Sequence, residues 1–182
     1  MLVLSEAVPN KKVMSIHAGG AIATTSAAII DPKNLKIVAF SVLAKGLRYF
    51  SVVHSSDIRE WSALGLIINS EDDVMEVDEN MPKIREIIES NFNLEGIGVR
   101  TETGKRLGKV KSYVFETDGF FVVKLYVEKS SMLGLFSQPL VIDRDSVVNV
   151  TNKLIVISDD KAKARVKGSR NKKEVEYGFS GN

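Results

Sequence analysis

The chain has 182 residues, of which 44% are apolar and 26% are charged, which is the composition of an ordinary globular protein. It contains no cysteine, and this excludes disulfides, thiolate metal ligands and a cysteine nucleophile. No apolar run approaches the roughly 20 residues of a membrane-spanning helix, and the first residues lack the basic start and long apolar segment of a secretory signal. We therefore expect a soluble, cytoplasmic protein.

The net charge of +2 hides an uneven distribution. Residues 161–182 hold seven basic and two acidic side chains, a charge of +5, whereas residues 1–160 hold 18 basic and 21 acidic ones, a charge of −3. The basic residues of this tail are Lys161, Lys163, Arg165, Lys167, Arg170, Lys172 and Lys173. Such a tail favours an anionic partner, and its composition predicts flexibility. The alternative is a solvated tail that only aids solubility.

The first half of the chain is expected to form short strands. Val13–His17 is the first strand, and Ala27–Ile30 leads into Asp31-Pro32-Lys33-Asn34, whose residues are typical of a turn. Leu35–Leu43 is apolar on both faces, which predicts a strand with one face in the core and the other partly covered. By strict alternation, one face carries Leu35, Ile37, Ala39, Ser41 and Leu43, and the other carries Val38, Phe40 and Val42. Leu64–Ile68 is expected to close the unit.

Residues 78–91 have the pattern of an amphipathic helix. Pro82 suits its first turn, and Asp78 or Asn80 is placed to cap it. One apolar stripe is formed by Met81, Ile84, Ile87 and Ile88. Because an apolar stripe needs a surface to cover, we expect the helix to pack against one or both flanking units. The alternative is an independent helix that binds a partner.

The second half, roughly residues 93–158, is expected to form a similar set of strands. A glycine-punctuated turn at Gly104–Gly108 precedes an expected strand at Val110–Phe115. Asp118-Gly119 is a strong hairpin signal between two apolar runs. In the strand that follows, alternation places four residues on one face: Phe121, Val123, Leu125 and Val127.

The two halves share a closing motif of an Asp turn, an apolar run and a cluster of acids. Its matching residues are Asp57 and Asp145, Leu66 and Leu154, and Ser70 and Ser158, and the members of each pair are 88 positions apart. Self-similarity over such a distance indicates duplication of a whole small domain rather than a solenoid repeat.

These residues resemble the PRC-barrel family, which includes a domain of the photosynthetic reaction-centre H subunit and the C-terminal barrel of RimM-type ribosome maturation factors. The resemblance is carried by the glycine turn Gly104–Val110, the strand Val122–Val127, and the closing pattern of Leu140–Ile142, Asp145–Val147 and Leu154–Val156. The first half matches less well at its glycine pair, Gly19-Gly20, but Asp57-Ile58 and Leu66–Ile68 fit.

The resemblance implies a mainly β fold of two tandem small antiparallel PRC-like β-barrels joined by a short α-helix. The expected boundaries are 1–78 for the first barrel-like domain, 79–92 for the linker helix, 93–160 for the second barrel-like domain and 161–182 for the basic tail. Members of this family generally act as docking modules. The resemblance therefore implies a non-catalytic role.

We therefore expect a non-enzymatic adaptor that binds a protein or a ribonucleoprotein partner, such as a ribosomal particle. The alternative is a peripheral membrane scaffold whose basic tail is drawn to anionic lipid. The seven cations of the tail are the candidates for anion contacts. The candidates for partner docking lie in an apolar loop and are Met132, Leu133, Leu135 and Phe136, because exposed apolar patches usually mark contacts. This loop is alternatively a cover for the open end of the second barrel.

No pattern in the chain predicts catalysis, a cofactor or a metal. His17 and His54 each follow an apolar stretch and belong to no spaced ligand motif. Glu71-Asp72-Asp73 lacks the spacing of a calcium loop. The glycines of Gly104–Gly108 are one residue too close for a phosphate loop, and a strand rather than a helix is expected after them. Trp61 is interpreted as a packing anchor, with an interface hot spot as the alternative.

Overall fold

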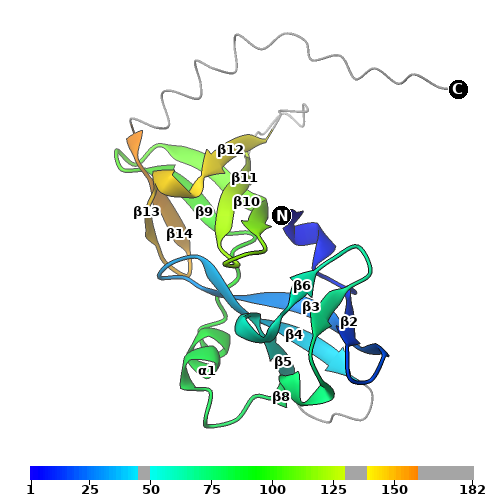
Figure 1. The fold of residues 1–182 in the computed structure, drawn as a ribbon. Helices are drawn as coiled ribbons and strands as arrows, with labels where there is room; N and C mark the ends of the chain where they lie inside the picture. Colours follow the sequence, from blue (N-terminus) through cyan, green and yellow to red (C-terminus); the bar gives the residue numbers. More distant parts are fainter. Residues whose placement is uncertain (45–49, 130–138, 160–182) are drawn as a thin grey trace, which may run out of the picture.

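The computed structural model describes residues 1–44, 50–129 and 139–159. Most of these residues lie in strands, and the strands form two seven-stranded sheets that are both mixed (Figure 1). The prediction of a mainly β fold is therefore confirmed. No helix within the described residues is both long and apolar enough to cross a bilayer.

The first sheet has the strand order β6-β7-β2-β3-β4-β5-β8. Its strands are β2 (Lys12–Ser15), β3 (Gly20–Asp31), β4 (Lys36–Ala44), β5 (Ser51–His54), β6 (Glu60–Trp61), β7 (Leu66–Ile68) and β8 (Val74–Glu76). The short 3₁₀ turns η1, η2 and η3 span Ser5–Ala7, Ser55–Asp57 and Glu71–Asp73. The acidic run Glu71–Asp73 is the turn η3 itself, and Ser70 and Asp73 form a capping box at its start.

The second sheet has the order β12-β11-β10-β9-β14-β13, and the N-terminal strand β1 adds to β10. Its strands are β1 (Leu2–Leu4), β9 (Gly98–Thr101), β10 (Arg106–Glu116), β11 (Val122–Glu128), β12 (Leu140–Asp143), β13 (Val147–Val150) and β14 (Leu154–Ile157). The turn η4 spans Arg144–Ser146. Gly104 has a φ of +87° and leads into the strand β10, as the sequence predicts.

The two sheets repeat one topology. The order β6-β7-β2-β3-β4-β5 of the first sheet is matched, strand for strand, by β13-β14-β9-β10-β11-β12 in the second. The short turns η2 and η4 occupy the same place in both, directly after β5 and β12. The internal repeat predicted from the sequence is thus a repeat of sheet topology, and we call β2–β7 the first repeat and β9–β14 the second.

The expectation of purely antiparallel sheets is wrong for one strand pair in each repeat. β2 pairs with β7 in parallel, and β9 pairs with β14 in parallel. The closing strand follows the opening strand after a long excursion through the rest of the sheet, and a long connection permits parallel pairing. Among the described residues neither sheet closes on itself, because β6, β8, β12 and β13 each pair with one strand only.

A bulge in each long hairpin changes which residues face the core. In the first repeat Ile30 pairs with Ile37 and Ile29 with Ala39, so Val38 is an extra residue. Strict alternation is therefore wrong across this point, and Ile37 and Phe40 both contribute to the main core. The second repeat has the same irregularity, and the core residue there is Val122 instead of Val123.

One hydrophobic core is shared by both repeats. The fully buried rings of Phe40, from the first repeat, and Phe115, from the second, have centroids 6.1 Å apart. Trp61 of the first repeat packs edge-on against Phe115 at 5.4 Å, and Phe120 packs against Phe40 at 5.7 Å. The interpretation of Trp61 as a packing anchor is therefore confirmed, and its partners come from both repeats.

The helix α1 (Pro82–Glu89) covers the outer face of the first sheet (Figure 1). Ile84 and Ile87 are buried against a second, smaller cluster that contains Ile29, Val38, Ala39 and Val52. The prediction that the apolar stripe packs on a flanking unit is confirmed. The predicted side-chain cap is wrong, because Met81 holds the N-cap position and makes no capping hydrogen bond.

Lys83 ties α1 to the first hairpin. Its Nζ lies 2.8 Å from Oδ2 of Asp31, whose side chain is only 5% exposed. Burial raises the pKa of Asp31, but the hydrogen bond and charge of Lys83 and the backbone N–H of Lys33 outweigh it. The net pKa of Asp31 therefore lies below its ordinary value.

Replacing Lys83 with Met is expected to lower the free energy of unfolding at pH 7 by about 1 kcal/mol, a modest value because Lys83 is largely exposed. The pKa of Asp31 is lower in the folded protein than in the unfolded chain, where it is about 3.9, so the ionised carboxylate stabilises the fold above that pH. This stability is lost as the pH falls through the folded-state pKa. The difference between the wild type and Lys83→Met should therefore shrink below about pH 4. Urea titrations at pH 7 and pH 3 measure it. If the stability difference between the two proteins is the same at both pH values, the ion pair of Lys83 with Asp31 does not cause it. The variant Lys111→Met, at an exposed position, serves as control.

Candidate functional site

The candidate residues predicted from the sequence lie outside the described part of the chain. This holds for Met132, Leu133, Leu135 and Phe136, in the connection between β11 and β12, and for the seven cations of residues 161–182. The docking loop and the basic tail therefore stay predictions. The described residues contain a different candidate site, at the junction of the two repeats.

The junction is built by the tips of the two long hairpins, which meet reciprocally. The backbone N–H of Ile37 donates to the carbonyl of Phe120 at 2.8 Å, and that of Val122 donates to the carbonyl of Leu35 at 2.9 Å. Leu35 and Phe120 hold the same place in their hairpins, and both have a positive φ, 56° and 59°. This pairing has the form of an approximate two-fold contact, in which each repeat offers the same backbone groups to the other.

A groove that is open to solvent lies on one side of this contact, and we call it the junction groove. It has a volume of about 520 Å³. One wall is the hairpin tip Pro32–Leu35 of the first repeat, and the other is formed by Arg144, Asp145 and Val147–Val150 of the second. The site therefore exists only because the two repeats stand next to each other.

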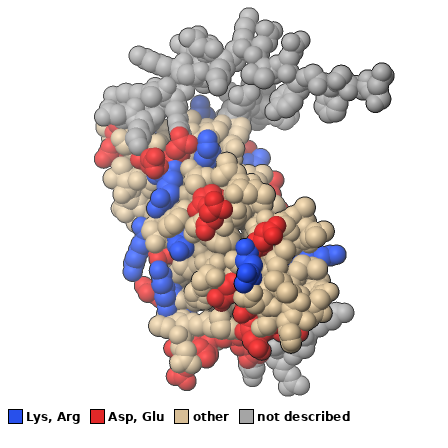
Figure 2. Space-filling view, in the orientation of Figure 1, with Lys and Arg blue, Asp and Glu red and all other residues tan. Residues whose placement is uncertain are grey.

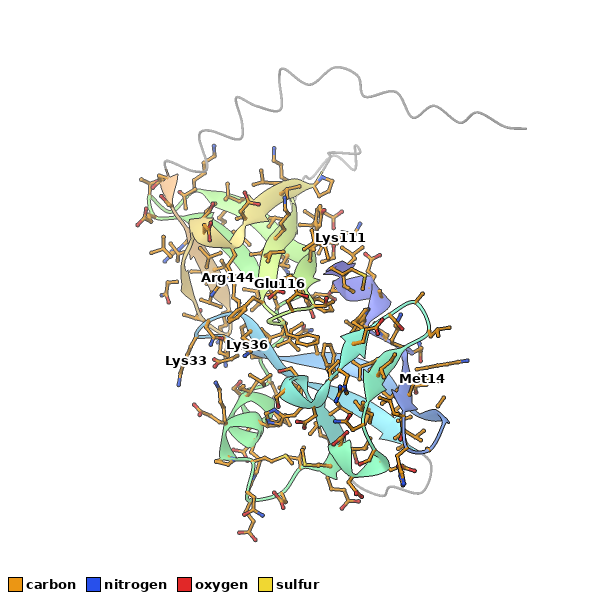
Figure 3. All side chains as sticks on the ribbon, viewed as in Figure 1. Met14, Lys33, Lys36, Lys111, Glu116 and Arg144 are labelled. Carbon is orange, nitrogen blue, oxygen red and sulfur yellow. The ribbon has the colours of Figure 1, made fainter. Side chains whose placement is uncertain are left out.

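Three cations lie at the junction, and two of them, Lys33 and Arg144, line the groove. Arg144 donates from Nη2 to the carbonyl of Asn34 at 2.8 Å, and its guanidinium lies over the ring of Phe121, 5.0 Å from the centroid. The ammonium of Lys36 lies 5.4 Å from the same centroid, and Lys33 belongs to the hairpin wall. Figure 3 shows Lys33, Lys36 and Arg144 together on one side of the junction.

These cations form no salt bridge within the described residues, although Lys33 interacts electrostatically with the carboxylate of Asp31. No carboxylate there lies within 4.0 Å of the charged nitrogens of Lys33, Lys36 or Arg144. Figure 2 shows blue side chains along this edge of the molecule, whereas red ones gather at the lower end, near β8 and α1. An unpaired cluster of cations beside a groove attracts anionic groups.

The groove also exposes a free strand edge. β13 pairs with β14 on one side, and no described strand pairs with its other side. The side chain of Val148, at a bulge in this strand, is 56% exposed. The groove therefore combines a strand that has no second partner strand among the described residues with an exposed apolar side chain and positive charge.

The described residues do not assemble a recognisable catalytic centre. They contain no group of three or more His, Asp or Glu side chains placed to hold a metal ion. His17 contacts Glu71 at 3.2 Å, and its side chain is 80% exposed. His54 lies 3.5 Å from the hydroxyl of Ser56. Neither histidine lines the junction groove.

The sequence patterns included one segment of each groove wall, but they did not include Arg144 and did not bring the two segments together. Asp31-Pro32-Lys33-Asn34 was expected as a turn, and Asp145–Val147 as part of the closing motif, yet Asn34 and Arg144 are 110 positions apart. The available signal was the duplication itself, because two similar units in one chain suggest a mutual interface. The relative placement of the units is what selects Lys33 and Arg144.

In comparisons with known proteins, no protein-family model matches the chain, and no curated protein matches it either.

Proposed function

We propose that this protein is a non-enzymatic adaptor that docks on a protein partner, and that the junction groove is one of its docking surfaces. The observation that carries the proposal is the groove itself, where the cations Lys33 and Arg144, the exposed Val148 and a strand edge without a described partner strand meet. Binding surfaces of adaptors combine such apolar and polar groups.

We also propose that each repeat is a PRC-barrel-like domain, with α1 between the two in the chain. The repeated strand order and the repeated turn after β5 and β12 support this proposal. The boundaries 1–78, 79–92, 93–160 and 161–182 belong to the same proposal, as does a cytoplasmic location. The shared aromatic core supports a rigid pair of domains, since the rings of one repeat pack on those of the other.

The test is quantitative affinity capture from an extract of the source cells with the full chain as bait. The variant Lys33→Glu with Arg144→Glu reverses the charge of the groove and should reduce recovery of the specific partner at least tenfold. The matched control, Lys105→Glu with Arg106→Glu, makes the same change in net charge at exposed positions outside the described groove lining and should keep recovery. Unfolding curves of both variants establish that they are folded.

Three outcomes contradict the proposal. The first is that the groove variant and the control recover the same proteins equally. The second is that binding is lost on nuclease treatment, which assigns the partner contact to RNA. The third is that the chain binds anionic vesicles and loses this binding only when residues 161–182 are removed, which assigns the function to a membrane scaffold.

A further inference from the structure

We propose that the junction groove binds an acidic, extended peptide segment of a partner protein, which pairs with the free edge of β13 as an added strand. This inference rests on the proposed adaptor function and specifies the chemistry of the partner. It follows from the strand edge, from the difference between the two repeats, and from the charges around the groove.

The edge of β13 is suited to strand addition. A free edge presents N–H donors and C=O acceptors in a row, and an extended peptide satisfies both kinds of group. The four residues of Val147–Val150 span about 13 Å at the usual rise per residue. They include neither Pro nor a charged residue, so two of the common protections of a sheet edge are absent, while the bulge at Val148 leaves the side chain of this residue exposed to a partner.

The equivalent edge of the first repeat is protected, which makes the open edge a property of the second repeat alone. The matching strand, β6, has only two residues, Glu60 and Trp61. Glu60 places a charge on the edge, and Trp61 is buried in the shared core. Because the duplicated units share their strand order, this difference distinguishes β13 from its counterpart β6. Among the described residues β8 and β12 also lack a second partner strand, but neither lines the groove.

The groove walls select an acidic peptide. Lys33 and Arg144 line the groove between the hairpin tip and β13. Lys36 lies outside the lining, but its ammonium packs over the same Phe121 ring as Arg144 and adds a third positive charge nearby. Carboxylates that alternate with apolar residues in an extended chain reach these cations on one face, while the apolar residues contact Val148. A polynucleotide matches the site less well, because it has no backbone N–H for the carbonyls of β13.

The test begins with a selection from a display library of random peptides on the immobilised full chain. Peptides that also bind the variant Lys33→Glu with Arg144→Glu are removed by counter-selection. We expect the enriched peptides to alternate β-branched or aromatic residues with Asp or Glu, and to bind the wild type at least tenfold more tightly than the variant. No enrichment, or enrichment of basic or helix-periodic peptides, overturns the proposal.

N-methylation of the best peptide then tests strand pairing itself. An added strand uses the N–H groups of alternate residues only. Methylation of one alternate set should therefore reduce affinity at least tenfold, whereas methylation of the other set should leave most of the affinity. Equal tolerance of both sets overturns strand addition. If the groove variant still loses the natural partner in that case, the adaptor function stands and only the binding mode is wrong.

Displacement separates peptide from nucleic acid. A single-stranded RNA oligonucleotide that displaces the selected peptide and binds more tightly than it does overturns the assignment of the groove to a peptide. Binding of the selected peptide that withstands an excess of this RNA supports the assignment.

Discussion

Replacing Phe115 with Ala is expected to lower the free energy of unfolding by about 3 to 5 kcal/mol, the usual cost of removing a fully buried aromatic ring. Phe115 is 0% exposed and contacts Phe40 and Trp61 of the other repeat. Because this ring belongs to a core that both repeats share, the whole described structure should still unfold in one transition. Urea denaturation followed by fluorescence of Trp61 and by far-UV circular dichroism measures both effects.

The matched control for this variant is Phe50→Ala, since the side chain of Phe50 is 52% exposed. Its expected cost is below about 1 kcal/mol, because little apolar area is returned to water. Two separate transitions, with only one shifted by Phe115→Ala, would show that the repeats unfold independently and that the shared core contributes little to stability.

Replacing Gly108 with Ala is expected to destabilise the protein by at least about 3 kcal/mol, or to prevent folding. Gly108 has a φ of +143°, a conformation that residues with a Cβ rarely adopt. A Cβ at this position would lie 2.0 Å from the carbonyl oxygen of Glu128 in the neighbouring strand β11. The backbone of Glu128 cannot move aside without breaking the β10–β11 pairing. The steric overlap and the unfavourable φ therefore both destabilise the variant.

Gly20→Ala is the control for the glycine substitution, because a Cβ on Gly20 meets no atom within 4 Å. It should change the free energy of unfolding by less than about 1 kcal/mol. Thermal and urea unfolding of the wild type, Gly108→Ala and Gly20→Ala measure these free energies. A Gly108→Ala protein as stable as the wild type would be inconsistent with the close approach of β10 and β11 described above.

The sequence was informative wherever the relevant interaction is local or periodic. The helix at Pro82–Glu89 follows from the spacing of Ile84 and Ile87, and the hairpin between β10 and β11 follows from Asp118-Gly119. Alternation failed where a bulge inserts Val38, because a bulge depends on the partner strand and not on the residue itself. The parallel pairing of β7 with β2 was not predicted either, because the direction of a pairing also depends on the partner strand.

For the candidate site too, the sequence shows local patterns but not the contacts between distant segments. The duplication is visible in pairs such as Leu66 and Leu154, since side-chain patterns of a repeated unit persist in the chain. The junction groove is not visible there, because Lys33 and Arg144 belong to different repeats and approach only when the hairpin tips exchange their backbone hydrogen bonds. The docking loop and the tail proposed from composition alone lie outside the described residues.

By itself, the amino-acid sequence determined that this protein is a duplicated β-rich unit with an amphipathic helix between its copies, since periodicity and turn chemistry act over a few neighbouring residues. The tertiary structure alone decided that the copies share one aromatic core and that β13, which has no second partner strand among the described residues, lies beside Lys33 and Arg144. Such contacts join residues far apart in the chain, and their formation depends on how whole sheets pack.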